Sequence, residues 1–560
     1  MLLIRNTLLG LFLGSCLGLS CVYPDYLTSG FVVLLVVGCI FKIVTNVSTS
    51  YIMWCIGFSF HLSSMWWIAP TISRFGGFHG VAAFFLLLLY SALGALQFYL
   101  SGRLSGLIVS SRFCLDKLTS QHFLPWVFIL IWMLLEILFP RLFPWGLGDF
   151  FISWKYFSSL SELIGSRGCS LLVLLMGLSV FRVYQNSISR SQIQNTYEYI
   201  PASSSSSLFV TIIIFLSSVF GIGIYLHNRS VYEDQKEENF RALVVQGNLD
   251  IYKKGNLSFF EANISTYQSL TENGLIALDG SGKLPHLIIW PETVMNKWTP
   301  SFVNLYPDSS FDPFPGLSFP LLYGSLAYDL KEGEPESAAR FYNAALLRDS
   351  QGELLSFYGK RILMPFGEYV PFSEIFPWMK KLVPIGGSFS VGPVTEPLLV
   401  PLSESSLGGG NNSNLKVGVL ICYEDLSAEL SRKYARSGAQ VLVNLTNDAW
   451  YGDSPAPFQH DLLARFRAIE TRKHLIRATN TGLTSHISPS GEILKSLPLF
   501  EPASETFEFK ANTRLTWYAV LGDLPLYSFL GLLSMFLFFK LFCRNQDKKR
   551  TNFLKNFLRL

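Results

Sequence analysis

The sequence predicts two structural parts, a polytopic α-helical membrane part followed by a globular α/β domain. Half of the 560 residues are hydrophobic and only 15% are charged, whereas soluble domains carry about 25% charged residues. Only six of the 40 acidic residues precede position 227. The front of the chain is therefore apolar enough to lie in lipid, and the back is polar enough to fold in water.

Long apolar stretches predict the membrane spans, because backbone amides in lipid must find partners within their own helix, which takes about 20 residues. Eight stretches qualify, near residues 7–22, 28–47, 50–69, 80–101, 123–143, 168–186, 208–226 and 524–543. We therefore expect a transmembrane domain (1–226), a globular domain (227–522), a last transmembrane helix (523–543) and a basic tail (544–560).

Lys and Arg residues in short loops predict the orientation, because they stay on the cytoplasmic side. With eight spans, eleven basic residues of the short loops and the tail fall on one side, so we expect both termini in the cytoplasm and the globular domain outside it. These residues are Arg5, Arg103, Arg112, Lys117, Arg190, Arg544, Lys548, Lys549, Arg550, Lys555 and Arg559.

The first 23 residues also allow a second interpretation. Arg5 precedes an apolar run that ends in small residues, as in a cleaved signal, and Leu13–Cys16 resembles a lipoprotein processing box. We favour a retained span, because removing one span would break the charge pattern.

The globular part alternates short apolar runs with amphipathic stretches. This alternation is typical of layered α/β domains, whose functional groups lie where strands end and helices begin. We expect strands at 241–246, 287–290, 321–325, 343–348, 415–422, 441–444 and 484–488, and helices at 259–273, 427–437 and 458–472.

One cysteine is the first candidate for chemistry. Of the eight cysteines, Cys422 alone lies outside the apolar stretches and their short loops. An extracytoplasmic domain normally pairs its cysteines, so a solitary thiol there is either a small core residue or a reactive group. Cys422 ends an apolar strand and is followed by Tyr423 and Glu424. A nucleophile at such a turn can use backbone amides to bind an oxyanion.

A thiol nucleophile also needs a base and a cation. Glu292 follows the apolar run 287–290, where desolvation would raise its pKa toward that of a usable base. Lys360 lies eight residues before Glu368. A lone Glu or Lys is usually a solvated surface residue. Together, however, Cys422, Glu292 and Lys360 would supply the nucleophile, the base and the cation that thiol chemistry requires.

Four motifs resemble, in their order along the chain, the Glu-Lys-Cys triad of the nitrilase superfamily. They are Trp290-Pro291-Glu292, Lys360, Pro365–Glu368 and Cys422–Glu424. Further motifs, together with the spans, make the chain similar to the apolipoprotein N-acyltransferase family over nearly its full length. They are Val245–Asn248, Tyr342-Asn343, Asn447–Gly452, Gln459-His460, Arg477–Gly482 and Gly522-Asp523, with a looser match at Phe75–Gly77 and Phe143–Gly146. The family usually carries a Trp shortly after its Gln-Gly-Asn motif, whereas this chain has 249–254 without one.

The resemblance implies an extracytoplasmic αββα sandwich and a two-step acyl transfer. Glu292 would be the base, Cys422 the nucleophile and Lys360 the oxyanion cation. The implied supporting or substrate-binding residues are Glu368, Glu424, Tyr423, Asn343, Asn447, Trp450 and Trp378.

The resemblance also implies the substrates and the place of the reaction. The acyl donor would be a phospholipid, and the acceptor the N-terminal α-amine of a diacylglyceryl-cysteine in an apolipoprotein. The enzyme would be a multi-pass protein of the bacterial inner membrane with a periplasmic catalytic domain. The sequence gives no sign of oligomerisation, and we expect a monomer.

Three other function classes stay open. A membrane-tethered amidase of the nitrilase type would share the triad but pass the acyl group to water. A transporter would need more ionisable residues at membrane depth than this chain offers. A non-catalytic lipoprotein-binding module would tolerate loss of the Cys422 thiol.

Several cofactors and partners are set aside. A net charge of +4 over 560 residues provides no basic field for nucleic acid. The run 280–283 lacks the spacing of a phosphate-binding loop, and no G-x-S-x-G elbow occurs. His460 and His474 have no cysteine or carboxylate cluster at ligand spacing, so we expect no metal and no cofactor.

Two further features carry open hypotheses. Residues 372–392, which include Trp378, are apolar and rich in Pro and Gly, and we interpret them as a mobile lid on the membrane rather than a core-packing loop. Glu136 lies within a span and requires a partner, for which Arg141 is near. The pair is either an internal packing contact or a contact to a lipid head group.

Overall fold

The computed structural model describes residues 2–23, 27–45, 50–110, 117–193, 203–280, 283–301, 311–330, 335, 338–381, 389–393, 396–402 and 414–557. Arg112, Arg559 and part of the expected lid (382–388) lie outside these ranges. The chain divides into two compact units. The helical unit contains Met1–Ala69, Val81–Ile224 and Asp523–Leu560, and the α/β unit contains Pro70–Gly80 and Tyr225–Gly522.

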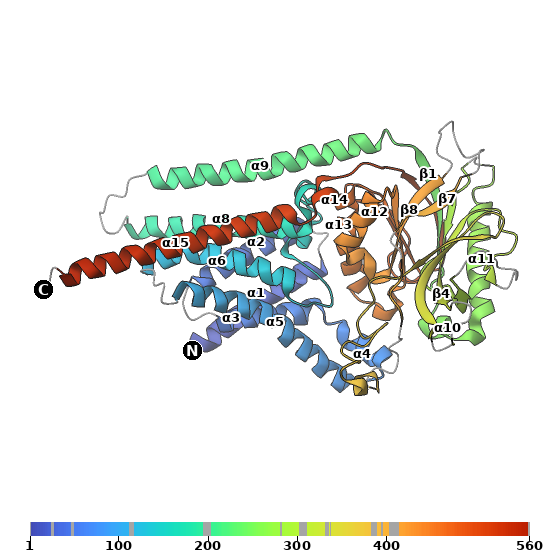
Figure 1. Cartoon of the computed structure of the whole chain (residues 1–560), viewed down its shortest axis with the longest axis horizontal. Coiled ribbons are helices and arrows are strands. Elements are labelled where there is room, and N and C mark those ends of the chain that lie inside the picture. The colour runs from blue at the N-terminus through green and yellow to red at the C-terminus, as the bar shows by residue number, and fades with distance from the viewer. Residues whose placement is uncertain are drawn as a thin grey trace. The chain divides into compact units, whose positions relative to one another are not determined.

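The helical unit consists of long apolar helices. Helices α2, α6, α8 and α15 pack side by side (Figure 1). The helices of this unit are α1 (Leu2–Val22), α2 (Leu27–Val44), α3 (Ser50–Ser64), α5 (Gly80–Ser110), α6 (Lys117–Leu138), η1 (Leu147–Phe151), α7 (Lys155–Ser158), α8 (Ser161–Ile193), most of α9 (Ser203–Asp234) and α15 (Leu524–Phe557).

Five of these helices are long and apolar enough to cross a membrane: Leu3–Val22, Leu27–Val44, Gly80–Val109, Ser161–Ile188 and Phe209–Asp234. The pair α3 and α4 (Ile68–Gly76) makes a sixth if it is one broken span. The other two expected spans correspond, within the described residues, to shorter apolar helices, Phe123–Leu138 and Leu524–Lys540.

The expected continuous span at 50–69 is wrong. Helix α3 ends at Ser64, and α4 begins at Ile68 after a bend of 56°. Pro70 explains the break, because a proline inside a continuous helix lacks the N–H for the ladder and its ring clashes with the preceding turn. In the first turn of a new helix, the same proline is tolerated.

Helices α1 and α3 approach closely through glycines spaced four residues apart. A Cβ at Gly14 would lie 2.1 Å from the backbone oxygen of Ile56, and the neighbouring Gly10 and Gly18 face α3 in the same way. Small residues at this spacing let helix backbones pack in lipid, where no hydrophobic effect drives association. This is the packing expected of a spanning helix.

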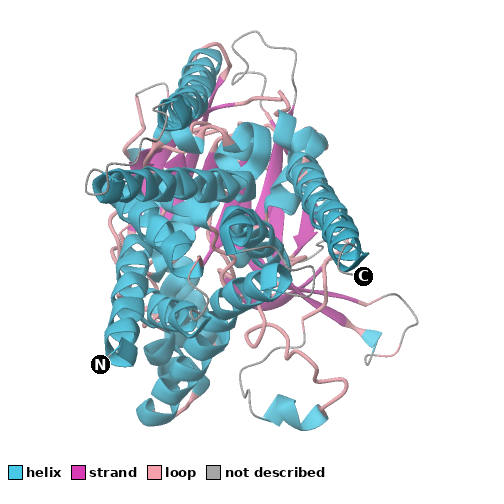
Figure 2. Ribbon diagram, turned by 90° about the vertical axis from the view of Figure 1, so that its left-hand side faces the viewer, coloured by secondary structure: helices cyan, strands magenta, loops and turns pink. Residues whose placement is uncertain are grey.

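The α/β unit contains all the described strands (magenta in Figure 2). The first sheet has the order β13-β1-β2-β4-β5-β6, with β3 paired to β4, and the second has the order β12-β11-β10-β9-β8-β7. The strands of the first sheet are β1 (Asn239–Gln246), β2 (Leu287–Ile289), β3 (Met295–Pro300), β4 (Leu321–Asp329), β5 (Arg340–Arg348), β6 (Leu354–Gly359) and β13 (Ala503–Lys510). Those of the second are β7 (Leu398–Pro401), β8 (Asn414–Ile421), β9 (Val441–Thr446), β10 (Leu475–Thr479), β11 (Ser485–Ile487) and β12 (Ile493–Ser496).

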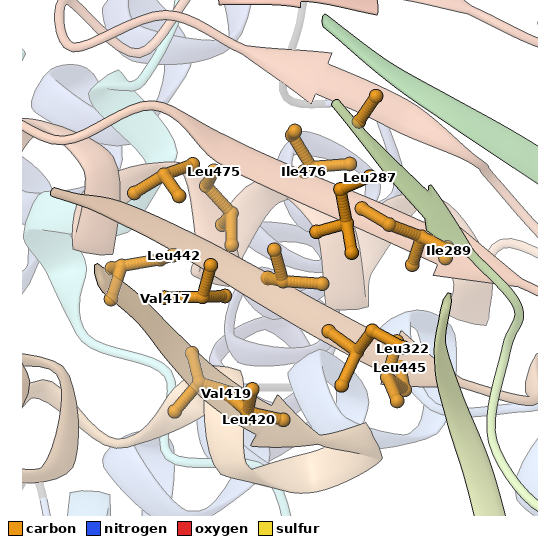
Figure 3. Close-up of a cluster of buried hydrophobic side chains, with 14 of the residues drawn as sticks. Leu287, Ile289, Leu322, Val417, Val419, Leu420, Leu442, Leu445, Leu475 and Ile476 are labelled. Atoms are coloured by element: carbon orange, nitrogen blue, oxygen red, sulfur yellow. The ribbon is translucent and has the colours of Figure 1, made fainter. Parts of the chain in front are cut away.

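The two sheets pack face to face over a buried apolar core. Figure 3 shows Leu287, Ile289 and Leu322 from the first sheet meeting side chains of the second, among them Val419 and Leu445. Helix α11 (Phe260–Ile276) covers the outer face of the first sheet, and α12 (Ala428–Arg436) and α13 (Ala456–Thr471) cover that of the second (Figure 1). The expected αββα sandwich is confirmed.

Every expected strand and helix of this unit has a counterpart, but six strands were missed: β3, β6, β7, β10, β12 and β13. Strand β13 alternates polar and apolar residues at a sheet edge, and all four residues of β12 are exposed. The fully buried β10 contains Arg477, which breaks the apolar run. These strands are held by pairing with neighbours rather than by continuous apolar character.

We predict that Gly14→Leu destabilises the helical unit. A leucine would drive α1 away from α3, and overpacking of this kind costs about 2–3 kcal/mol. The thermal unfolding midpoint of the full chain in detergent should fall by several degrees. The matched control is Gly106→Leu in α5, because a Cβ there meets nothing within 4 Å. Equal midpoints for the two variants would contradict the prediction.

Candidate active site

Cys422 lies at a sharp strand-to-helix turn. Strand β8 ends at Ile421, and Cys422 begins the 3-10 helix η7 (Cys422–Leu426). Its φ of 51° is in the left-handed region, which is strained for a residue with a side chain. Asn444 of β9 holds the turn by donating its side-chain N–H to the Cys422 carbonyl at 2.9 Å. The residue is partly exposed and packs against the apolar core between the sheets.

Glu424 fixes the turn to the neighbouring sheet. Its buried carboxylate accepts hydrogen bonds from the backbone N–H groups of Arg361 (2.6 Å), Ile362 (3.0 Å) and Ile421 (2.7 Å). The Tyr358 hydroxyl donates to the same carboxylate at 2.9 Å. The position beside Cys422 and the segment that follows Lys360 are therefore tied to one carboxylate.

Glu292 follows β2 on a backbone that only a glycine neighbour permits. Gly324 of β4 donates its N–H to the carbonyl of Pro291 at 3.0 Å. A Cβ on Gly324 would lie 2.6 Å from the Glu292 Cα and 2.4 Å from the Thr293 nitrogen. Thr293 itself has a φ of 51°. The close approach of β4 sets the direction in which Glu292 leaves its strand.

Lys360 lies between two carboxylates. Its Nζ is 2.9 Å from the Glu368 carboxylate and 3.7 Å from Oε1 of Glu292. Asn343 on β5 donates to Oε1 of Glu292 at 2.8 Å and to Oε1 of Glu368 at 2.7 Å. All four residues are buried. One amide and one ammonium thus hold both acids at fixed positions.

Burial and mutual charge set the protonation of this group. Burial raises the pKa of Glu292, and Lys360 opposes that rise. Burial also raises the pKa of the Cys422 thiol, and the Glu292 charge adds to it, while Lys360 acts in the opposite direction. For Lys360, burial lowers the pKa, but Glu368, Cys422 and Glu292 outweigh burial and raise it. Cys422 is therefore a neutral thiol at rest, beside a lysine that remains charged and a carboxylate of increased basicity.

Two protein-family profiles match separate parts of the chain. The profile for the Apolipoprotein N-acyltransferase N-terminal domain matches residues 13–179, and that for Carbon-nitrogen hydrolase matches residues 324–505. Among curated relatives, the Apolipoprotein N-acyltransferase of Geobacter metallireducens is 30% identical over 368 residues, which are 65% of this chain and 63% of the relative. That of Bdellovibrio bacteriovorus is 30% identical over 487 residues, covering 85% of this chain and 81% of the relative.

The chain belongs to the apolipoprotein N-acyltransferase family. It is an acyltransferase and a multi-pass membrane protein with a nitrilase-like domain. It is also similar to a solved structure, Saccharomyces cerevisiae Nit3, a member of branch 10 of the nitrilase superfamily, with 17% identity and a TM-score of 0.34 over 49% of this chain and 90% of that one.

Three other expected site residues lie just after strands β8 and β9. Tyr423 follows Cys422 directly and is partly buried. Asn447 follows β9 and bonds to Ala449 and Asn480 rather than to the triad. Trp450 is 37% exposed on η8 (Asp448–Tyr451) and packs edge-on against Phe75, with ring centroids 5.0 Å apart.

Trp378 lies on the exposed surface of the α/β unit. It is 58% exposed on the 3-10 helix η5 (Pro377–Lys381), and its ring centroid is 6.5 Å from that of Phe376. Phe372, Ile375 and Phe376 are also exposed large hydrophobic residues. The described part of the expected lid therefore presents apolar side chains outward.

Sequence reasoning missed a second buried lysine beside the triad. Lys254 of α10 (Ile251–Gly255) is 5% exposed and donates to the backbone carbonyl of Glu292 at 2.5 Å. The signal that found Glu292, a polar residue shortly after a buried strand, also applies to Lys254 after β1. Two consecutive lysines such as Lys253 and Lys254 are usually solvated, which hides this signal in the sequence.

A buried ionic cluster supports the nucleophile turn from below. His460 of α13 bonds to Asp425 at 2.7 Å and to Asp448 at 3.0 Å, and Arg477 bonds to Asp425 at 3.1 Å. Burial lowers the pKa of His460, but Asp425 and Asp448 outweigh burial and raise it to about 9. The histidine is therefore charged at neutral pH and links the residues that follow β8 to those that follow β9.

Glu136 and Arg141 of the helical unit make contacts of a different kind. Trp132 donates to the Glu136 carboxylate at 3.1 Å, whereas Arg141 donates to the backbone carbonyl of Glu136 at 2.9 Å. The Arg141 guanidinium also lies over the Trp145 ring, 4.8 Å from its centroid. Arg141 thus caps the end of the α6 segment through backbone groups.

In the described ranges of the chain, no group of three or more His, Cys, Asp or Glu side chains is arranged to hold a metal ion.

We predict that His460→Gln removes a pH-dependent part of the stability. The folded-state pKa of about 9 lies above the unfolded value of about 6.5, so the histidine stabilises the fold fully below pH 6.5, and that stabilisation is lost as pH rises through 9. The shift corresponds to roughly 3 kcal/mol. The difference in unfolding midpoint between wild type and variant should therefore shrink from pH 6.5 to pH 9. The exposed His79→Gln serves as the control, and a constant difference for His460→Gln would contradict the prediction.

Proposed function

We propose that the protein transfers an acyl chain from a phospholipid to the α-amine of the diacylglyceryl-cysteine at the N-terminus of an apolipoprotein, through a thioester on Cys422. The observation that carries this proposal is the buried arrangement of Glu292 and Glu368 around the Lys360 ammonium, together with the strained backbone at Cys422. Family membership supports the choice of substrates.

The first step forms the thioester. Glu292 accepts the thiol proton as the Cys422 sulfur attacks the ester carbonyl of the phospholipid. Because the thiol is neutral at rest, proton transfer accompanies the attack. Lys360 stabilises the oxyanion of the tetrahedral intermediate. Collapse breaks the C–O bond, and the leaving alkoxide takes the proton from Glu292 to give a lysophospholipid.

The second step forms the amide. The α-amine of the acceptor attacks the thioester carbonyl, and Glu292 takes the amine proton. Collapse breaks the C–S bond, and the thiolate recovers the proton. Asn343 and Glu368 keep Glu292 and Lys360 in position for both steps, and Glu424 and Tyr423 shape the nucleophile turn. We assign Asn447, Trp450 and Trp378 to substrate binding.

We further propose the placement of the parts in a bacterial inner membrane. Residues 1–226 and 523–543 would carry the spans, 227–522 would be the periplasmic catalytic domain, and 544–560 would be a cytoplasmic tail. The short-loop basic residues support this orientation. Both substrates keep acyl chains in lipid, so catalysis requires only that the ester and the amine reach the membrane surface.

A membrane-tethered amidase is the second candidate, since the carbon-nitrogen hydrolase profile matches residues 324–505, which include Lys360 and Cys422. The two activities differ in their products. Transfer adds an acyl chain to the peptide amine, whereas hydrolysis releases a free acid. Intact-mass analysis of the products distinguishes them.

We predict that the full chain in detergent forms an acyl thioester on Cys422 with phospholipid alone. Cys422→Ala should abolish it, and Glu292→Gln should slow it about 100-fold or more, because a positioned base contributes 10²–10⁴-fold. The acylated peptide is detected by mass spectrometry and is cleaved by neutral hydroxylamine. The matched control is Glu261→Gln, an exposed acid on α11 of the same unit. A lipoprotein acceptor N-acylated by Cys422→Ala would disprove the mechanism.

We predict that the exposed segment at Trp378 enters the lipid interface. Adding phospholipid vesicles to the full chain should shift the fluorescence of Trp378 to shorter wavelength, since the indole leaves water. The Trp378→Phe variant isolates this signal by difference. Trp298→Phe, at another exposed tryptophan of the same unit, is the control. A difference spectrum unaffected by vesicles would exclude the membrane-lid hypothesis.

A further inference from the structure

Lys254 is held at the active site by a set of backbone contacts. Asn248 and Leu249, which follow β1, donate backbone N–H groups to Asn480 at 2.7 and 3.1 Å. Asn296 donates to the Lys254 carbonyl at 2.8 Å. The ammonium then donates to the Glu292 carbonyl at 2.5 Å. This position is therefore built into the fold and does not depend on a mobile side chain at the surface.

The charges of the buried group explain why a second cation is needed. Glu292 and Glu368 are two buried acids, and Lys360 provides only one positive charge between them. Asn343 contributes hydrogen bonds but no charge. A buried charge without compensation is strongly destabilising. Lys254 brings a second positive charge into this region, bound to the backbone carbonyl of Glu292.

The position of Lys254 is also suited to the chemistry. Its ammonium interacts favourably with the charge of Glu292 and with the charge that Cys422 acquires when its thiol loses the proton. It reaches Glu292 through the main chain, whereas Lys360 faces the carboxylate itself. A neutral donor would suffice for the hydrogen bond to the Glu292 carbonyl, so that bond alone does not require the positive charge of a lysine.

We propose that Lys254 is a positioning residue of the transfer reaction, whose positive charge balances the buried acids and keeps Glu292 ionised as the base. This inference rests on the proposed function. Removing the charge leaves Glu292 and Glu368 with Lys360 alone, so Glu292 should hold its proton to higher pH. The base would then be available over a narrower pH range.

The protonation of Lys254 gives the proposal a second consequence. Burial lowers the pKa of Lys254 to about 8, while Glu292 and Cys422 act in the opposite direction. The titratable groups near this region are Glu292, Glu368, Lys360, Glu424, Cys422, Asp448 and the tyrosines 423 and 451. The pKa values of both tyrosines and of Cys422 are raised, and burial raises the pKa of Glu424 to about 7, so Lys254 is the member of this group that loses a positive charge just above neutral pH.

The test is the pH dependence of Cys422 acylation by phospholipid alone, measured on the full chain in detergent from pH 5 to pH 10. We compare Lys254→Gln, which keeps a donor without the charge, with Lys254→Arg, which keeps the charge. Lys254→Gln should move the acidic limb of the rate profile upward by roughly one pH unit. Lys254→Arg should leave the acidic limb in place, because an arginine keeps the positive charge throughout this pH range.

The controls separate this role from a structural one. Lys253→Gln removes the exposed neighbouring charge and should leave the profile unchanged. If Lys254 had a purely structural role, Lys254→Gln would have the same pH profile of Cys422 acylation as the wild type. That result would overturn the inference. If thermal unfolding in the same detergent shows that Lys254→Gln does not fold, the test uses Lys254→Arg, and an upward shift of its acidic limb despite the retained charge overturns the inference equally. Failure of the wild type to acylate Cys422 would instead refute the proposed function on which the inference rests.

Discussion

The burial of Glu292 and Glu368 around a shared ammonium is the constraint on which the rest of the site depends. Water cannot solvate these carboxylates, so the protein must supply each hydrogen bond and each counter-charge itself. Asn343 on β5, Lys360 after β6 and Lys254 on α10 come from separate segments of the chain, and each is directed at one of the two acids or its backbone. The same burial raises the pKa of the Glu292 carboxyl, which increases its basicity. A cost to stability and a gain in reactivity thus have one physical origin.

The nucleophile turn shows a second balance between strain and support. Cys422 has a positive φ, which a residue with a side chain adopts at a cost of about 1–3 kcal/mol. Hydrogen bonds to Asn444 and Glu424 hold the backbone on either side of Cys422. His460 and Arg477 bind the carboxylate of Asp425, three residues further along the chain. The strain persists because the packing around it permits no relaxed alternative. A thiol fixed in this way needs little reorganisation when a substrate arrives.

The sequence predicted the fold class and the central groups because both depend on local patterns. Apolar length identified the helices of the membrane part. The ends of predicted strands identified Glu292 and Cys422, and Lys360 was identified by its spacing to Glu368. The roles of these three residues remain a proposal, although the structure brings Glu292 and Lys360 to 3.7 Å. The remaining features depend on contacts between distant segments. Predicting the bend after Ser64 requires knowing that Pro70 lies in the first turn of a new helix. Arg477 interrupts the apolar run of β10 and hides that strand. Lys254 is buried because Asn480 and Asn296 position α10. None of these has a periodic signal along the chain.

The carboxylate of Glu424 has a mechanical consequence. It accepts bonds from Tyr358 and from the main chain just after β6 in one sheet, and from Ile421 at the end of β8 in the other. Sliding of the two sheets past each other would tear these bonds, so the sandwich is latched at the edge where the thiol emerges. The positions of Cys422 and Lys360 relative to each other therefore depend on how the two sheets are aligned. Such a latch lets surface segments vary freely in length while the reacting atoms keep their spacing.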